Sequence, residues 1–115
     1  MKGLIRSMKL SQLNNLYLTI TDNVFHYFAK AKPDQYIVYA EDSEAGSSYA
    51  DDKKEFQVIE GTTDYFTTIE FDPNVKDIQD IMTVNEIVWK LNSVQYEEDT
   101  GYIHYEWLWE VDNIG

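Results

Sequence analysis

The sequence predicts an α+β fold: an antiparallel β-sheet with a long C-terminal hairpin and two helices packed on one face. Two segments carry apolar side chains at helical spacing. The segments between and after them are rich in Tyr, Thr, Val and Ile, which favour strands. The order is therefore helix, strands, helix, hairpin, which is typical of an antiparallel sheet with its helices on one side.

The most regular segment is 102–111, which we expect to be the second strand of the hairpin. Its side chains alternate between a large apolar set and a more polar set, as in a strand with one buried face. The apolar set is Ile103, Tyr105, Trp107, Trp109 and Val111. The first strand is expected at 86–96. Residues 97–101 connect the two strands, and Gly101 is free to adopt a positive φ.

One register satisfies both strands, with Tyr96 opposite Tyr102. It also pairs Leu91 with Trp107, Trp89 with Trp109 and Ile87 with Val111. The same register places Val94 with Tyr96 and Tyr102 on the face opposite the tryptophans. Two hypotheses follow. Either a β-bulge near Asn92 and Ser93 restores a single apolar face, or the tip projects and packs on a second subunit.

The N-terminal part reads as helix, turn and strand. Residues 9–20 repeat apolar side chains at helical spacing, which predicts the first helix. Residues 24–28 fit either a continuation of this helix or a short edge strand. Residues 35–40 carry bulky apolar side chains on both faces, which indicates a central strand.

The middle of the chain is expected to form a loop, a long strand and the second helix. Residues 41–54 combine Gly, Ser and acidic side chains, which favours a mobile polar loop that orders against a partner. Residues 55–71 are β-prone, with Gly61 at a bulge or a bend. Asp72 and Pro73 resemble the N-cap and first residue of a helix that runs to about Val84.

Length and composition limit the classes of fold and function. The 115 residues fit one domain with a single core. Met8 followed by Lys9 resembles a second start, which would make residues 1–7 a flexible extension or a cloning remnant. The absence of cysteine excludes disulfides and thiolate metal sites. No stretch is apolar and long enough to span a membrane.

Charge is strongly negative and unevenly distributed. At a net charge of −12, the chain is not expected to bind nucleic-acid phosphates, since Lys and Arg do that work. No acid precedes Asp22, and no Lys or Arg follows Lys90. A basic start and an acidic end could meet between subunits, although ordinary solubility charge explains most of these residues.

The histidines, His26 and His104, are the candidates for acid–base chemistry. His104 and Glu106 share one face of a predicted strand and could touch, which would suit a small hydrolase. Same-face polar neighbours are common in sheets, and no nucleophile motif or phosphate-binding loop accompanies them. The acids of 41–54 lack the ordered spacing of a calcium loop. We therefore expect no enzymatic activity, no cofactor and no metal.

Three stretches of the chain resemble a protein family: YIVYAEDSEAGSSYADDK, GTTDYFTTIEFD and YEEDTGYIHYEWLWEV. From about Met8 onward the chain is similar to the small tail-completion proteins, also called tail terminators or minor tail proteins, of long-tailed phages and prophages of Gram-positive bacteria. The resemblance implies a non-enzymatic virion protein, assembled in the host cytoplasm. It also implies a ring, commonly a hexamer, that caps the tail-tube protein and meets the head-connector proteins.

Two surfaces follow from this resemblance as hypotheses. Carboxylates lining a ring would repel DNA phosphates and let the duplex slide. The residues expected there are Glu41, Asp42, Asp51 and Asp52. A ring also needs one surface to meet a different surface on the next copy. The residues expected there are Val94, Tyr96 and Tyr102, together with the basic N-terminus.

Two other interpretations stay open. The first is an acidic DNA mimic that inhibits a nuclease, which would carry its acids along one continuous face. The acids of this sequence are expected mainly in loops and at strand ends, which disfavours the mimic. The second is a related head–tail connector or minor capsid protein.

Overall fold

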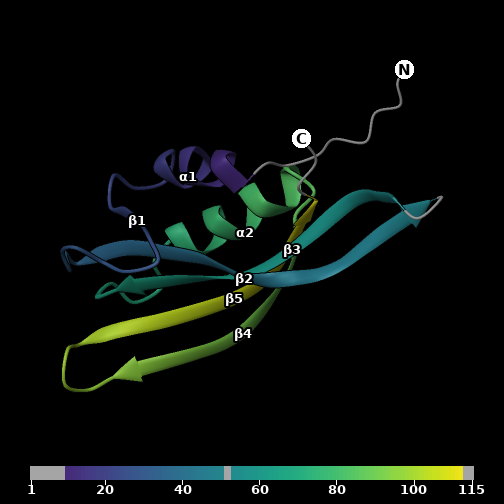
Figure 1. Cartoon of the computed structure of the whole chain (residues 1–115). Helices are drawn as coiled ribbons and strands as arrows, with labels where there is room; N and C mark the ends of the chain where they lie inside the picture. The colour runs from purple at the N-terminus through teal and green to yellow at the C-terminus, as the bar shows by residue number, and fades with distance from the viewer. Residues whose placement is uncertain (1–9, 51–52, 113–115) are drawn as a thin grey trace.

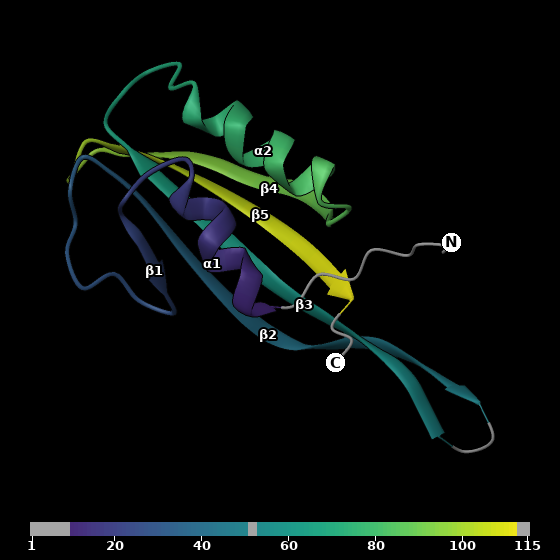
Figure 2. The same cartoon turned by 90° about the horizontal axis from the view of Figure 1, so that it is seen from above.

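Two helices lie against one five-stranded sheet. The computed structural model describes residues 10–50 and 53–112, with side chains at 10–45 and 57–112. The elements are α1 (Leu10–Leu18), β1 (Val24–His26), β2 (Gln35–Ala50), β3 (Lys53–Thr67), α2 (Asn74–Val84), β4 (Val88–Glu97) and β5 (Tyr102–Asp112). Both helices cover the same face of the sheet (Figures 1 and 2), which confirms the predicted α+β architecture. In the described part of the chain, neither helix is long and apolar enough to cross a membrane.

The strands lie in the order β1-β2-β3-β5-β4. Neighbours are antiparallel except β1, which runs parallel to β2 and pairs Val24 with Ile37. The ambiguous segment 24–28 therefore contains a short edge strand. The helix before it ends at Leu18, and Thr21 accepts a hydrogen bond of 3.2 Å from the Asn23 N–H, a local bond that competes with helix continuation.

The largest departure from the sequence prediction lies at 41–54, where we expected a polar loop. β2 instead continues to Ala50 and β3 begins at Lys53, and three shifts of register absorb the irregular residues. Within the described chain, β5 pairs with β3 only as far as Val58, so residues 46–50 and 53–57 overhang the sheet. We call this overhang the arm; it extends to the right in Figure 1. It projects beyond both helices, so it needs no apolar face, which explains its polar composition.

The C-terminal hairpin has the predicted register at its base. The pairs found there are Trp89 with Trp109 and Leu91 with Trp107. The register shifts by one residue after Leu91, so that Asn92 forms the expected β-bulge. This confirms the hypothesis that a bulge restores a single face. Gly101, at φ 80°, has the positive φ that we expected in the turn.

Helix α2 begins at Asn74, one residue later than predicted, with Pro73 rather than Asp72 at the N-cap position. Pro73 already has helical angles, and Asp72 Oδ1 accepts a hydrogen bond of 2.9 Å from the Asn74 N–H. The other carboxylate oxygen of Asp72 accepts from Tyr65 at 2.6 Å and Thr67 at 2.7 Å. The helix start is thus tied to the buried face of β3.

The core lies between the helices and the sheet. Its largest fully buried side chains are Trp107, Trp109, Tyr17 and Tyr65. Gly61 is required by close packing here. A Cβ at this position would lie 2.4 Å from the Ala40 carbonyl oxygen and 2.4 Å from the Trp109 ring, which no side chain tolerates.

Candidate functional site

The face of the sheet that the helices leave uncovered carries a row of carboxylates. We call this row the acidic face. Its members come from β2, β3 and β5 and are Asp42, Glu60, Asp64, Glu106 and Glu110. The register explains the row, because alternate residues of β3 and β5 point away from the buried tryptophans. Lys90 of β4 lies on the same face, opposite Leu108.

Four of these carboxylates form two cross-strand pairs. Asp64 lies directly opposite Glu106, and Glu60 lies directly opposite Glu110. Like charges in directly opposite positions destabilise a sheet, since their Cβ atoms are only about 5 Å apart. Glu106 gains some compensation from Asn92, whose Nδ2 donates a hydrogen bond of 2.8 Å to Glu106 Oε1. Asp64 accepts a hydrogen bond of 2.7 Å from His104 Nε2, so the cost in stability is expected mainly from the pair of Glu60 and Glu110.

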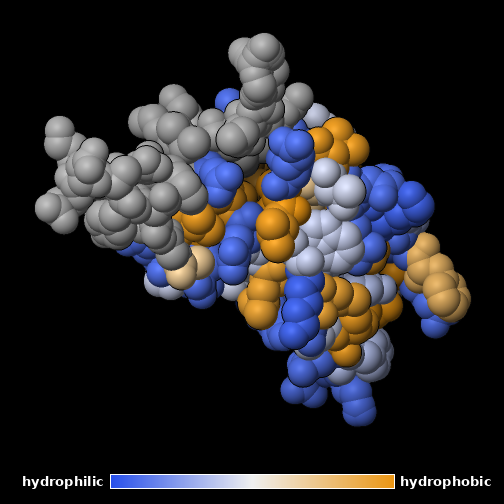
Figure 3. Space-filling view, turned by 90° about the vertical axis from the view of Figure 1, so that its right-hand side faces the viewer, coloured by the Kyte–Doolittle hydropathy of each residue, from blue (hydrophilic) through white to orange (hydrophobic). Residues whose placement is uncertain are grey.

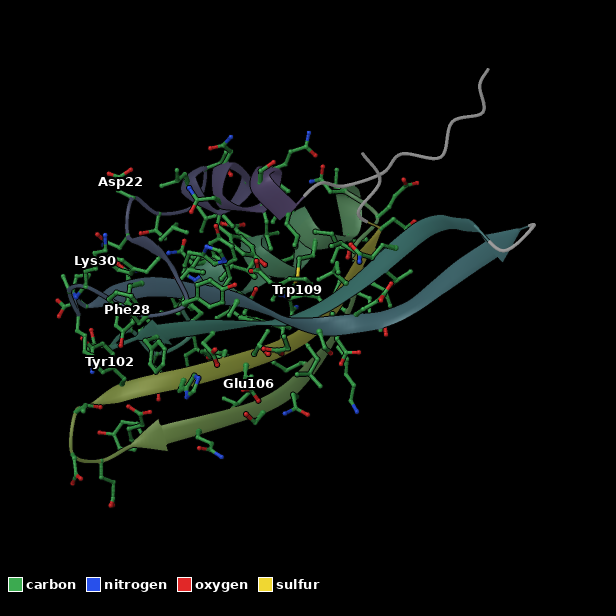
Figure 4. The ribbon with its side chains drawn as sticks, viewed as in Figure 1. Asp22, Phe28, Lys30, Tyr102, Glu106 and Trp109 are labelled. Atoms are coloured by element: carbon green, nitrogen blue, oxygen red, sulfur yellow. The ribbon has the colours of Figure 1, made fainter. Side chains whose placement is uncertain are left out.

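At the end near the β4–β5 turn, aromatic side chains surround a hollow of about 360 Å³, which we call the aromatic hollow. Tyr36 stacks on Phe66 with ring centroids 4.7 Å apart. Tyr102 meets both rings edge-on, at 5.6 and 6.0 Å. Phe28, from the loop after β1, also lines the hollow. Figure 4 shows Phe28 and Tyr102 at the same end of the molecule.

The aromatic hollow is held together by the hydroxyl of Tyr102. This hydroxyl lies 2.8 Å from the carbonyl oxygen of Lys32 and 2.7 Å from that of Pro33, and its one hydrogen is shared between them. The bond joins the β4–β5 hairpin to the loop that precedes β2. The two segments are 69 and 70 residues apart in the chain, so the walls of the hollow are fixed by tertiary structure.

His104 lies beside these rings and is the main titratable group of the hollow. It stacks on Phe66 with ring centroids 4.2 Å apart. Its Nε2 donates to Asp64 Oδ1 at 2.7 Å, and its Nδ1 lies 3.6 Å from Glu97 Oε2. The hydrogen bond to Asp64 raises the pKa of His104 above its usual value, against the lowering effect of burial. The imidazolium form is therefore favoured.

A second hollow, of about 270 Å³, lies on the same face toward the arm. Its lining is Asp42, Glu60, Gly61, Val88, Trp89, Lys90, Leu108, Trp109 and Glu110. Figure 3 looks onto the end of the molecule from which the arm extends, and shows apolar side chains gathered between hydrophilic ones. This surface mixes apolar area with carboxylates and suits contact with another macromolecule more than a small ligand.

The predicted acidic loop does not exist as one group. Glu41 is paired with His26, whose Nε2 donates to Glu41 Oε1 at 2.6 Å. Burial alone would raise the pKa of Glu41, but the hydrogen bonds from His26, from the backbone and from Tyr27 together hold it below its usual value. Asp42 instead belongs to the acidic face, where its Oδ2 accepts from Thr62 at 2.9 Å. Asp51 and Asp52 lie outside the described residues.

The predicted self-association residues do not share one face. Beyond the bulge, Val94 lies opposite Tyr105 and Tyr96 lies opposite Ile103. Both therefore point to the helix side of the sheet, yet they remain 50% and 65% exposed. Tyr102 points to the other side, into the aromatic hollow. The prediction that the three residues share a face was wrong, because the one-residue bulge reverses the side on which every later residue of β4 lies.

The His104–Glu106 contact that we considered is replaced by others. His104 bonds to Asp64 on the neighbouring strand, and Glu106 accepts from Asn92. Sequence reasoning missed Asp64 because its proximity to His104 depends on the pairing of β3 with β5. The alternation in GTTDYFTT was the available signal for the face of Asp64. Among the described residues, no three acidic or histidine side chains gather as metal ligands would.

Comparison of the sequence with protein-family models and with curated proteins finds no match.

Proposed function

We propose that this protein is a structural component of a phage or prophage virion that completes the tail tube at the head–tail junction as a ring of identical copies. The observation that carries the proposal is that, among the described residues, no further strand covers two strand edges in different parts of the chain. One is the outer edge of β4, and the other is the overhanging arm. The sequence resemblance supplies the class of particle.

The outer edge of β4 has the character of an interface. In the described chain, β4 is the last strand of the sheet. Its exposed large apolar residues are Val88, Leu91, Val94 and Tyr96. An exposed edge strand with apolar side chains pairs with another chain unless charges or a covering segment protect it. Lys90 and the bulge at Asn92 are the protective features that we find in β4.

The arm supplies a complementary element. Its backbone donors and acceptors on the outer sides have no third strand within the described residues. Strand addition of an arm to the β4 edge of the next copy would satisfy both sets of backbone groups. Such a contact joins two different surfaces, so it is heterologous. Heterologous contacts close into rings when the rotation between copies permits it.

The acidic face supports the role in the tail. A ring through which DNA passes must not hold the duplex, and carboxylates repel its phosphates. The cross-strand pairs of Asp64 with Glu106 and Glu60 with Glu110 concentrate that charge on one surface. This face replaces the 41–54 segment as the surface that we expect to line the lumen.

Solution mass tests the assembly. We expect light scattering across a concentration series to find a species of about six copies, or one that grows with concentration, and imaging to show a central hole. The variant Val94→Lys/Tyr96→Lys places two charges on the exposed apolar edge and should shift the chain toward monomer. The matched variant Ser93→Lys/Gln95→Lys adds the same charges to the same strand on its other face and should still assemble. If both variants assemble equally, the apolar side of the β4 edge is not part of the contact between copies.

A second candidate function gains support from one observation. We expected the acids in loops and at strand ends, but five of them share the acidic face, which suits an acidic DNA mimic that inhibits a nuclease. Residues i and i+4 of a strand are about 13 Å apart, so Glu60 and Asp64 on β3 and Glu106 and Glu110 on β5 form two rows with the same spacing. A mimic predicts a monomer or dimer that binds one basic enzyme tightly. The ring predicts assembly without such an enzyme.

A further inference from the structure

We propose that the aromatic hollow binds the guanidinium group of Arg6 from the basic amino-terminal segment (residues 1–9) of a neighbouring copy. This inference rests on the proposed assembly for the source of the segment. It assigns a binding site that the ring by itself does not require.

The hollow has the chemistry that recognises a cation. Its lining joins the exposed rings of Tyr27 and Phe28 to the carboxylates of Asp64 and Glu97. The ring of Phe66 already stacks on Tyr36 and His104, so it supports the wall without offering a free face. Aromatic faces attract cations through their quadrupole, and carboxylates accept charge-assisted hydrogen bonds. Phe28 is 64% exposed, so much of its surface is available to a ligand.

Two cationic groups in the same lining offset part of the negative charge of these carboxylates. They are Lys32 and His104. His104 already lies between both acids, at 2.7 Å from Asp64 and 3.6 Å from Glu97. Further negative charge surrounds the hollow, from Glu98 and Asp99 in the adjoining turn and from Glu106 on the same face. The surroundings therefore remain acidic.

The chain itself offers one segment that fits. Residues 1–9 contain Lys2, Arg6 and Lys9 and no acid, and Arg6 is the one arginine of the sequence. Arginine is the preferred partner for stacked rings combined with carboxylates, because its planar guanidinium stacks and forms several hydrogen bonds at once. Leu4, Ile5 and Met8 add apolar side chains for the aromatic walls.

The other cations of the chain fit less well. Lys76 forms an ion pair of 2.6 Å with Asp80, and Lys53 and Lys54 are flanked in sequence by acids. Lys90 lies in a strand and lines the second hollow. Lys30 and Lys32 belong to the loop that borders the hollow. Helix α1, which begins at Leu10, lies on the helix side of the sheet (Figure 1), whereas Tyr102 points into the hollow on the other side. This placement favours insertion into a neighbour over insertion into the same copy.

A photo-crosslinking experiment on the full chain tests the contact. A benzoylphenylalanine at position 28 should crosslink to residues 1–9, identified by mass spectrometry. Mixing isotope-labelled and unlabelled copies separates crosslinks between copies from those within one copy. We expect crosslinks between copies, and a loss of most of them in the Arg6→Gln variant. Crosslinks confined to one copy, or to other parts of the chain, would overturn the proposal.

A peptide titration separates this inference from the ring itself. The synthetic peptide MKGLIRSMK should bind the full-length chain even when that chain is monomeric. We expect Phe28→Ala to weaken peptide binding by about fivefold or more, as loss of a cation–ring contact predicts. The matched control is Phe71→Ala, which removes a ring that is 89% exposed in the loop before α2 and should leave binding unchanged. Absence of peptide binding would overturn the inference. The light-scattering measurement would still test ring assembly separately.

Discussion

The indole N–H of Trp109 donates a hydrogen bond of 2.8 Å to the hydroxyl oxygen of Thr63 in the centre of the core. The hydroxyl of Tyr17 lies 2.7 Å from the same oxygen. All three residues are buried, and they come from β5, β3 and α1. One threonine hydroxyl therefore satisfies two buried aromatic groups and fixes α1 on the sheet.

Replacing Thr63 by valine should lower the free energy of unfolding by about 2–4 kcal/mol, because it leaves two buried polar groups without their partner. Thr63→Ser keeps the hydroxyl and should lose much less. Urea denaturation followed by tryptophan fluorescence measures both. The control is Thr62→Val, on the opposite face of the same strand, where the hydroxyl bonds to Asp42 near solvent. A loss for Thr63→Val no larger than for Thr62→Val would contradict the buried network.

Asp72 should make stability depend on acid pH. Burial alone would raise the pKa of Asp72, but hydrogen bonds from Thr67, Tyr65, the Asn74 N–H and Gln35 lower it below its usual value. A lowered pKa means that the stabilisation is complete above the usual carboxyl pKa and disappears as pH falls through the folded value.

Asp72→Asn should therefore cost about 1–3 kcal/mol at neutral pH, since hydrogen bonds to a charged group are lost from a buried site. The difference between the two proteins should shrink as the pH approaches 2. Denaturant titrations at several pH values measure this. Asp77→Asn, an exposed acid in the first turn of α2, serves as the control. A difference that does not change with pH would exclude the ionised form as the stabilising one.

His104 should titrate above its usual pKa, because it donates to Asp64 and lies beside Glu97. A raised pKa means that the imidazolium contributes its stabilisation fully below the usual histidine pKa. That contribution is lost as pH rises through the folded value. Proton NMR of the imidazole resonances measures the titration. Asp64→Asn should bring the pKa of His104 back down, and an unchanged value would remove Asp64 as the cause.

Local patterns predicted the base of the hairpin well. The alternation around Trp107 and Trp109 fixes which residues are buried, and a buried face allows one register. The bulge at Asn92 was one of two hypotheses because a single inserted residue carries no sequence signal of its own. Its consequence, the separation of Tyr96 from Tyr102, therefore had to come from the structure.

The arm and the acidic face were missed for a different reason. An overhanging ladder has no buried side, so residues 46–50 show no apolar alternation to mark them as a strand. The acidic face depends on the pairing of β3 with β5, two strands separated in the chain by α2 and β4. The alternation within GTTDYFTT was a signal for the face of Asp64 in its own strand, but nothing local to β3 indicates its neighbour Glu106.

Repulsion between the opposed carboxylates of the acidic face should lower the free energy of unfolding. Glu110→Gln removes one charge from the Glu60 pair and should raise the free energy of unfolding by about 0.2–1 kcal/mol. The gain should shrink in about 1 M salt, which screens exposed charges. Glu70→Gln, an exposed acid in the turn after β3, should give a smaller change and controls for net charge. A stabilised Glu110→Gln variant would show that the sheet retains repulsive charge at a cost in stability, which the proposed lumen would explain. A destabilised variant would mean that the pair is structural, and the acidic face would lose its support as the lumen.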